Sequence, residues 1–480
     1  MSVALLWLRQ DLRLADNPAL IRALASCERV VPVYIHAPEE SGDWRRGAAS
    51  NWWLHHALGA FETSLRALGS RLILRRGPSL AALTALVRET GASHLFWNRL
   101  YEPAHVARDT LIKEALRAEG LTVHSGNAAL LFEPWARTKD DGTPYRVFTP
   151  FWRGCLKSGL PTDIAPAPQA LPPVPETLDS TPLAALGLLP SIPWDSGLRG
   201  AWSPGESGAQ ARLEAFLTTR LADYGEDRDR PDHAGTSQLS PHLHFGEIGP
   251  RQIVAAVEHH VDGLREAAAR ATAEGYLREL GWREFAHHLL FHFPRTPQEP
   301  LDPRFTAFPW AERYAEALAA WQRGHTGIPI VDAGLRQLWT TGWMHNRVRM
   351  LVASFLTKNL LIPWQEGARW FWDTLVDADL ANNTLGWQWT AGCGADAAPY
   401  FRIFNPVTQG EKFDPEGDYV RQWVPELARL PAACIHQPWS APPATLSAAG
   451  VRLGRDYPEP LVDLRTSRAR ALARFGRIKR

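Results

Sequence analysis

The sequence predicts a two-domain protein, an N-terminal doubly wound α/β domain followed by an all-α domain. At 480 residues the chain exceeds what a single hydrophobic core usually supports. Short apolar runs alternate with helical patterns in the first quarter, and apolar spacing of three and four residues dominates from residue 207 onward. We therefore expect an α/β domain over 1–130, a connector over 131–206 and a helical domain over 207–480.

Five short apolar runs predict the strands of the first domain. They lie at 3–8, 30–37, 71–77, 94–99 and 121–126, and helix-like stretches near 17–26, 50–68, 79–90 and 103–119 separate them. A strand followed by a helix, repeated, is typical of a parallel sheet covered by helices. No GxGxxG follows the first run, so the usual dinucleotide fingerprint is absent.

The connector and the second domain differ in composition. Nine prolines between Pro161 and Pro193 predict an extended segment that packs over the surface. Helical patterns then follow at 211–224, 266–290, 313–324 and 346–361.

The overall composition is that of a folded globular protein, with 45% apolar and 21% charged residues. The net charge is only +1, yet 46 of the 52 basic residues are arginine. Arginine suits phosphate recognition, but a GC-rich genome explains this bias equally well. The four separated cysteines favour neither a zinc site nor disulfides, and we expect a reduced, cytoplasmic environment. With no export leader and no run of about 18 apolar residues, we expect no membrane span.

Tryptophan is concentrated in the helical domain. Of the 21 in the chain, nine lie between Trp310 and Trp389. Indoles commonly fill cores, but neighbouring indoles beside a redox cofactor can also pass an electron hole, and the sequence leaves both interpretations open.

The pattern at 345–360 predicts a helix with a functional face. Its core stripe consists of Val348, Leu351, Val352, Phe355 and Leu356. Asn346 and Met350 lie one turn apart on a shared face, and Arg347 and Arg349 are expected to point to other sides. Asp377 offers Arg349 an acidic partner, so a structural ion pair is plausible.

A second helix, near 276–290, has Glu279 and Trp282 on one face. A carboxylate beside an indole suits a flipped base, which offers N–H groups to bond and a ring to stack on.

The segment GTSQLSPHLHFG at 235–246 places Thr236, Ser237 and Ser240 before a helical pattern. Hydroxyls and backbone N–H groups at a helix N-terminus bind phosphate, although an ordinary helix cap explains the same residues.

Taken together, these segments resemble the photolyase and cryptochrome family, and within it the members that repair cyclobutane pyrimidine dimers in DNA. The matching stretches are WLRQDLRLADNPAL at 7–20, GTSQLSP, LGWREF at 280–285, TGIPIVDAGLRQL at 326–338, TGWMHNRVRM at 341–350, YFRIFNP and QGEKFD. Because they run nearly from end to end and in order, chance agreement is negligible. The resemblance implies the two-domain fold described above and FAD bound in the helical domain.

The resemblance also implies roles for individual residues. The flavin contacts would be Tyr224, Thr236, Ser237, Gln238, Leu239, Ser240, Arg349, Asp377, Asp379 and Asn383, with Asn383 facing flavin N5. The lesion contacts would be Glu279, Trp282, Asn346, Met350 and Trp389, with Arg228, Arg347 and Gln409 near the DNA. Electrons would reach the flavin through Trp387, Trp364 and Trp310. Glu279 would stabilise the reduced lesion.

Two positions indicate which members of the family the chain resembles most. The neutral Asn383 resembles the residue of the DNA-repairing members, whereas plant-type cryptochromes tend to carry Asp at this position. Asn346 stands where enzymes for (6-4) photoproducts carry His, which points to the cyclobutane lesion. An antenna chromophore is implied as well, methenyltetrahydrofolate being favoured over a deazaflavin. Trp52 and Trp53 could stack on its pterin, or they are helix core residues.

We therefore expect a monomeric, light-dependent DNA lyase acting on pyrimidine dimers. A photosensor that binds FAD and signals through a protein partner, and a flavoprotein that binds nucleic acid without photochemistry, are the alternatives. An intact lesion cavity favours the DNA lyase over the photosensor. Light dependence distinguishes both of these from the flavoprotein without photochemistry.

Overall fold

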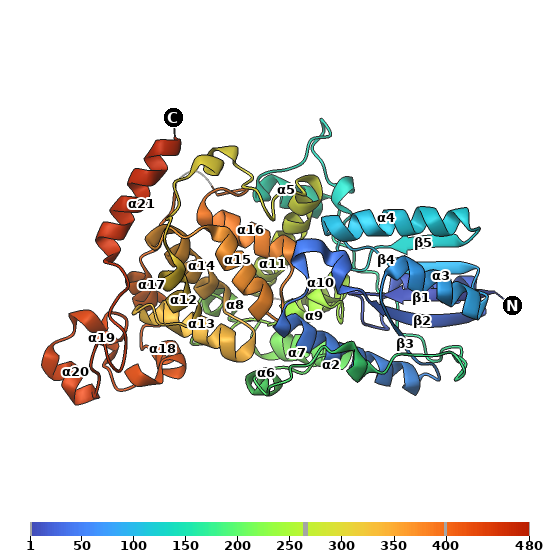
Figure 1. Ribbon diagram of the computed structural model, residues 1–480, viewed down its shortest axis with the longest axis horizontal. Coiled ribbons are helices and arrows are strands. Elements are labelled where there is room, and N and C mark those ends of the chain that lie inside the picture. The colour runs from blue at the N-terminus through green and yellow to red at the C-terminus, as the bar shows by residue number, and fades with distance from the viewer. Residues whose placement is uncertain (1, 263–266, 398–400, 480) are drawn as a thin grey trace.

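The computed structural model describes residues 2–262, 267–397 and 401–479. Tyr400, the first residue of the YFRIFNP motif, lies outside the described residues. Figure 1 shows the α/β domain at the end of the molecule that holds the N-terminus, and the helical domain with the C-terminus at the other end.

The α/β domain contains a five-stranded parallel sheet. Its strands are β1 (Val3–Leu8), β2 (Arg29–His36), β3 (Ile73–Arg76), β4 (His94–Asn98) and β5 (Thr122–Gly126), in the order β3-β2-β1-β4-β5. Every pairing is parallel. All six residues of β1 are buried, as a central strand covered on both faces requires. The predicted fold class and all five strands are confirmed.

Helices cover both faces of this sheet: α1 (Pro18–Ser26), α2 (Ala48–Ala67), α3 (Ser79–Thr90) and α4 (Pro103–Ala118). Alternate residues of β1 enter two separate cores, because successive side chains of a strand point to opposite faces. Leu6 and Leu8 pack with α1 and α2, and Leu5 and Trp7 pack with α3 and α4.

The connector is partly extended. Residues 161–182 form neither helix nor strand, as the prolines predicted. The sequence analysis missed α5 (Phe148–Lys157) and the short α6 (Ser196–Ala201). The signal for α5 was present, since Phe148, Phe151, Trp152 and Cys155 follow helical spacing and all are buried.

The second part of the chain is helical, and its described residues contain no strand. The first helices are α7 (Glu206–Thr219), α8 (Tyr224–Asp227), α9 (Ser240–His244), α10 (Pro250–Asp262) and α11 (Ala267–His292). They are followed by η4 (Pro303–Ala307), α12 (Ala315–Gln322), α13 (Pro329–Thr341), α14 (Asn346–Ser354), α15 (Trp364–Thr374) and α16 (Leu380–Ala391). The last are α17 (Pro406–Phe413), α18 (Asp418–Trp423), α19 (Ala432–Ile435), α20 (Pro443–Ala449) and α21 (Leu464–Ile478).

One predicted helix is interrupted. The pattern at 345–360 forms α14 and then a π-helical turn, η5 (Phe355–Asn359). The predicted core stripe is nevertheless buried throughout. Among the described residues, no helix is long and apolar enough to cross a membrane.

The two domains are joined by direct hydrogen bonds. The Ser50 hydroxyl donates to the Leu375 carbonyl at 3.1 Å, and the Trp372 indole donates to the Arg45 carbonyl at 2.6 Å. The Trp53 indole donates to Glu247 at 3.0 Å. Because buried polar groups need partners, these bonds fix how the α/β domain sits on the helices.

Candidate functional site

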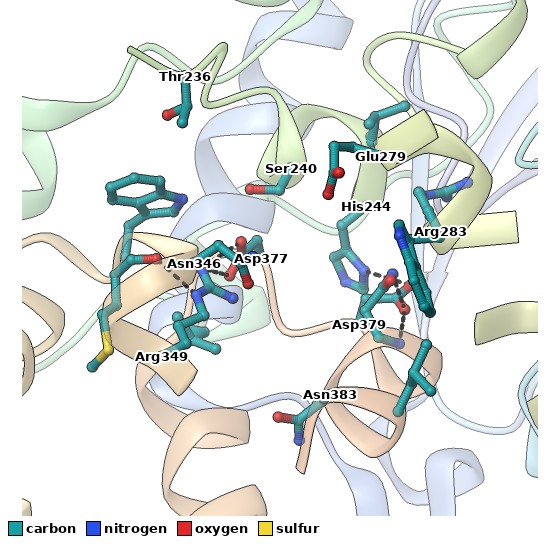
Figure 2. A pocket seen from close by; sticks show the side chains of 18 of the residues that line it. Thr236, Ser240, His244, Glu279, Arg283, Asn346, Arg349, Asp377, Asp379 and Asn383 are labelled. Atoms are coloured by element: carbon teal, nitrogen blue, oxygen red, sulfur yellow. Dashed lines mark hydrogen bonds and ion pairs between the residues drawn. The ribbon is translucent and has the colours of Figure 1, made fainter. Parts of the chain in front are cut away.

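The helical domain encloses a cavity of about 540 Å³, within the usual size range of cofactor sites. Its walls come from α8, α9, α11, α14 and α16, and Figure 2 shows their side chains converging on a common space. The lining includes most of the residues singled out in the sequence: Tyr224, Arg228, Thr236, Ser237, Gln238, Leu239, Ser240, Glu279, Trp282, Asn346, Arg349, Met350, Asp377, Asp379, Asn383, Trp387 and Trp389.

One wall of the cavity is rich in hydroxyl groups. Thr236, Ser237 and Ser240 line it, but none of them caps α9, whose N-cap residue is Leu239 without a side-chain cap. The expectation of an ordinary helix cap is therefore wrong. Gln238 has a φ of 52° and its side-chain oxygen accepts a bond from Arg212 at 2.7 Å. The Gln238 side chain is thus tied to α7, and the Ser237 hydroxyl is hydrogen-bonded with the Tyr276 side chain, so this wall of the cavity is lined by hydroxyl groups whose surroundings are partly fixed.

A half-buried ion pair lines another part of the cavity. Arg349 contacts Asp377 at 2.8 Å and donates through Nε to the Met344 carbonyl at 2.7 Å. The predicted ion pair is confirmed. Arg349 also lines the cavity, together with Asn346 and Met350, so the expectation that it points elsewhere is wrong. The long arginine side chain reaches around the helix, which spacing alone does not show.

Asp379 begins α16 and accepts two bonds from Asn382, both at 2.8 Å. Its other oxygen lies 3.4 Å from His287 Nε2 and 3.7 Å from His244 Nδ1. Burial alone would raise the pKa of Asp379, but His287, His244 and Arg283 together lower that pKa well below its ordinary value. Asp379 is therefore an anion at neutral pH and can accept hydrogen bonds from a ligand.

Glu279 and Arg228 form a pair at the cavity, 2.7 Å apart, with each side chain about one-third exposed. Burial tends to lower the pKa of Arg228, but Glu279, Tyr224 and Asp229 together outweigh burial and raise that pKa. Exposed to the cavity and charged, the pair can exchange its mutual bond for bonds to a ligand.

Two tryptophans complete this part of the lining. Trp282 stacks on Phe148 with ring centroids 3.8 Å apart, and the Trp389 indole donates to the Asp396 carbonyl at 3.2 Å. Both rings are thus held in place beside the cavity, as ring-stacking surfaces for a base require.

Asn383 projects into the space between the Arg349 ion pair and Asp379 (Figure 2). Its amide nitrogen donates to the Ala368 carbonyl at 3.0 Å. This bond orients the amide and makes the side-chain oxygen a neutral acceptor for a ligand N–H.

Four predicted site residues lie outside the lining of the cavity. Arg347 pairs with Asp229 at 2.6 Å, and Gln409 lies on α17. Trp364 is buried, and Trp310 is half-buried beside Phe308. The ring contacts of Trp387 join it to Phe371 at 5.0 Å and to Trp321 at 6.2 Å. The sequence analysis gave Trp321 no role of its own among the tryptophans of the helical domain.

The sequence analysis missed polar lining residues contributed by distant segments. His244 and Arg283 belong to the cavity, and His287 lies directly behind Asp379. The signal was His244 in the segment SPHLHFG and His287 in the helix after Trp282, both of which are buried. Their convergence on Asp379 depends on how α9, α11 and α16 pack.

Trp52 and Trp53 are core residues. Each is at most 1% exposed, and their indoles donate to Asp195 and Glu247. Neither ring has an open face, so the expectation that one stacks on a pterin is wrong.

The fold and the cavity together define a two-domain protein whose helical half contains a pocket of a size that suits a cofactor. Sequence comparison agrees in detail. The family model described as DNA photolyase matches residues 4–175, and that described as the FAD binding domain of DNA photolyase matches residues 276–477.

Individual relatives cover nearly the whole chain. The deoxyribodipyrimidine photo-lyase of Agrobacterium fabrum is 48% identical over 477 residues, which are 99% of this chain and 98% of that protein. Cryptochrome-1 of Arabidopsis thaliana is 42% identical over 480 residues, 97% of this chain and 69% of that protein. The crystal structure of a bacterial class III photolyase from Agrobacterium tumefaciens superposes with a TM-score of 0.95 at 46% identity, covering 100% of this chain and 98% of that one. This chain belongs to the DNA photolyase and cryptochrome family, and its helical domain is the FAD-binding domain of that family.

Proposed function

We propose that this protein is a deoxyribodipyrimidine photolyase that acts as a monomer and uses light and FAD to split cyclobutane pyrimidine dimers in DNA. The observation that carries the proposal is that the same cavity holds the residues suited to a flavin and the residues suited to an everted base. The relative that is 48% identical over nearly its full length is named for this activity.

The residues of the cavity fit the cofactor. Tyr224 and the segment from Thr236 to Ser240 would hold the phosphates and ribose of FAD. Arg349, Asp377 and Asp379 would surround the flavin ring, with charged groups fixed by their own partners. Asn383 would present its amide oxygen to flavin N5. The bound FAD supplies the electron that splits the dimer on illumination.

The lesion would occupy the rest of the cavity. Trp282 and Trp389 would provide ring surfaces, and Asn346 and Met350 would border the pyrimidines. Glu279 would accept hydrogen bonds from the base edge. A damaged dinucleotide stacks poorly, so everting it costs less free energy than everting an intact pair, and recognition of damage gains from that difference.

Arginines near the cavity would bind the DNA backbone. Arg228 and Arg347, with Gln409, are assigned this role, which gives affinity that is independent of sequence and weakens with salt. Both arginines have acidic partners in the structure, Glu279 and Asp229. The DNA must compete with these ion pairs for both guanidinium groups.

Trp387, Trp364 and Trp310 are assigned the electron path from the surface to the flavin. Trp387 lines the cavity, Trp364 is buried and Trp310 is half-buried, in the order expected of such a path. We also propose methenyltetrahydrofolate as an antenna chromophore, in preference to a deazaflavin, at a site other than the face of Trp52 or Trp53.

A second candidate function is photoreception. It is favoured by the 42% identity to Cryptochrome-1. The lesion-binding set of Glu279, Trp282, Asn346, Met350 and Trp389 lines the cavity in full, and a sensor that acts through a protein partner has no need of it.

The test compares Glu279→Gln with wild type on an oligonucleotide that contains one dimer, in light and in dark. Glutamine keeps the size of the side chain but loses the charge. Because a hydrogen bond to a charged group is worth about 1.5 to 3 kcal/mol, we expect repair to slow by about tenfold to a hundredfold. Recovery of thymine absorbance measures repair, and flavin content is measured on the same samples.

Glu274→Gln is the matched control, because Glu274 lies on the same helix but is exposed to solvent. It should repair at the wild-type rate. Absence of light-dependent repair by the wild-type protein would reject the photolyase function. Loss of flavin from Glu279→Gln would show that the residue holds the cofactor site together instead.

A further inference from the structure

The C-terminal helix α21 is rich in basic residues. It contains five arginines, Arg465, Arg468, Arg470, Arg474 and Arg477, and no acidic residue, and Lys479 follows it. Residues 463–480 carry seven basic side chains and one acidic side chain. Since the whole chain is only +1, the other 462 residues are net negative. Such a concentration of positive charge in one helix is typical of surfaces that bind polyanions.

The helix is anchored through one side only. Ser467, Ala471 and Ile478 are buried, and Phe475 stacks on Phe401 with centroids 4.3 Å apart. Arg470 donates to the Asn359 carbonyl at 2.7 Å. These contacts leave the opposite side of the helix open to solvent.

The basic side chains form two rows that flank that open side, and one of them, Arg474, is half-buried and donates to the Pro309 carbonyl. At 100° per residue, Arg470, Arg474 and Arg477 lie along one edge of the buried stripe, and Arg465, Arg468 and Lys479 lie along the other. Ala469, Ala473 and Gly476 lie between the rows, so a partner could approach the backbone closely. The two rows together span about 20 Å of helix, or roughly six base pairs of DNA.

Most of this charge is uncompensated. Arg465, Arg468 and Arg477 are exposed, and no ion pair between described residues involves any of them. Burial, followed by repulsion from Arg470 and Arg477, lowers the pKa of Arg474, against a weaker opposing effect of Glu312. Like charges held this close raise the energy of the free protein, and an anionic partner would relieve that repulsion.

The helix contacts a residue that lies near the cavity wall in the sequence. The Trp389 indole at the cavity wall donates to the Asp396 carbonyl, and Phe401, five residues further along the chain, stacks on Phe475 of α21. Figure 1 shows α21 along the outer edge of the helical domain. A duplex that extends from the cavity toward this edge would reach α21.

We propose that the two basic rows of α21 bind the phosphate backbone of duplex DNA outside the damaged site. This inference rests on the proposed function, because it takes DNA as the polyanion. The helix adds affinity that depends on duplex length and on salt and is independent of both sequence and lesion.

The experiment measures binding in the dark to two duplexes that carry the same central dimer, one of about 8 and one of about 30 base pairs. The variant is the triple change Arg465→Gln, Arg468→Gln and Arg477→Gln, which spares the arginine bonded to Asn359. We expect about tenfold or greater loss of affinity for the long duplex, with a salt slope reduced by about two to three units. Affinity for the short duplex should be unchanged.

A matched control removes the same charge from the far end of the molecule, through Arg22→Gln, Arg88→Gln and Arg117→Gln on the exposed surfaces of α1, α3 and α4. Equal affinities of the two triple variants for the long duplex would overturn the proposal. The proposal would also be overturned if the wild-type protein bound phosphatidylserine vesicles and the α21 variant lost this binding but kept its affinity for DNA. Light-dependent repair of the short duplex by both variants tests the proposed function separately.

Discussion

Asn383 shows how one side chain can connect the fold to the cofactor. The bond from its amide nitrogen to Ala368 ties α16 to α15 and leaves the amide oxygen as the acceptor in the cavity. The sequence identified the residue by resemblance, but its orientation depends on a carbonyl fifteen positions earlier in the chain. In the proposed complex with FAD, a neutral group here, with anionic Asp379 close by, would keep a further negative charge away from the flavin.

Asn383→Asp should change the redox state of the bound flavin under illumination, because it replaces a neutral acceptor with an acidic group. The measurement is the flavin absorption spectrum during photoreduction. Asn383→Ser also loses the bond to Ala368 but introduces no acid, so its spectra should stay closer to wild type. Identical photoreduction by all three proteins would contradict the role assigned to Asn383.

The helix α14 carries Asn346, Arg349 and Met350 into the cavity, and its first turn is held by His345. Nδ1 of His345 accepts a bond from the Arg347 N–H at 3.2 Å. Burial, together with Arg347 and Arg349 and against Asp229 and Asp232, lowers the pKa of His345 to about 4. His345 is therefore neutral at physiological pH, as an acceptor at a helix N-terminus must be.

Lowering the pH should destabilise the folded protein through the N-cap of α14. Between pH 6.5 and pH 4 the unfolded chain binds a proton at His345 that the folded chain does not, so the free energy of unfolding falls as the pH falls. For His345 the loss is at most about 3 kcal/mol. His345→Asn keeps an N-cap acceptor without titrating, and unfolding followed at several pH values should show wild type losing more stability than the variant below pH 6.5. Parallel curves would contradict this cap.

The position of the two domains depends on close approach as much as on hydrogen bonds. Gly47 precedes α2 and lies against the end of α15, where a Cβ would overlap the backbone of Asp373 and lie 2.6 Å from the Trp372 carbonyl oxygen. The α/β domain thus rests directly on the helix that supports Asn383. Trp53, bonded to Glu247, holds the same interface further along α2.

Gly47→Ala should lower the melting temperature and expose the connector to proteases, because the clash involves backbone that cannot move aside. We expect a loss of about 1 to 3 kcal/mol. Gly59→Ala in the same helix is the control, since its Cβ would meet only the Leu183 side chain at an ordinary 3.7 Å. It should be neutral or stabilising by up to about 1 kcal/mol. Equal melting temperatures would show that the interface adapts.

Local pattern determined a large part of this protein. The five strands, the helices between them and the buried stripe of α14 followed from apolar periodicity, because it depends on neighbours within a few residues. Most of the cavity lining followed instead from the resemblance to a known family. The short α5 could also have been found, from the spacing of Phe148, Phe151, Trp152 and Cys155.

Tertiary structure alone decided which of these groups meet. The pairing of Glu279 with Arg228, the histidines around Asp379, the contact of Trp387 with Trp321 and the burial of Trp52 and Trp53 all join segments far apart in the chain. The reason is physical: a side chain's charge, orientation and exposure are set by what packs against it, and periodicity within one segment carries no record of its distant partners.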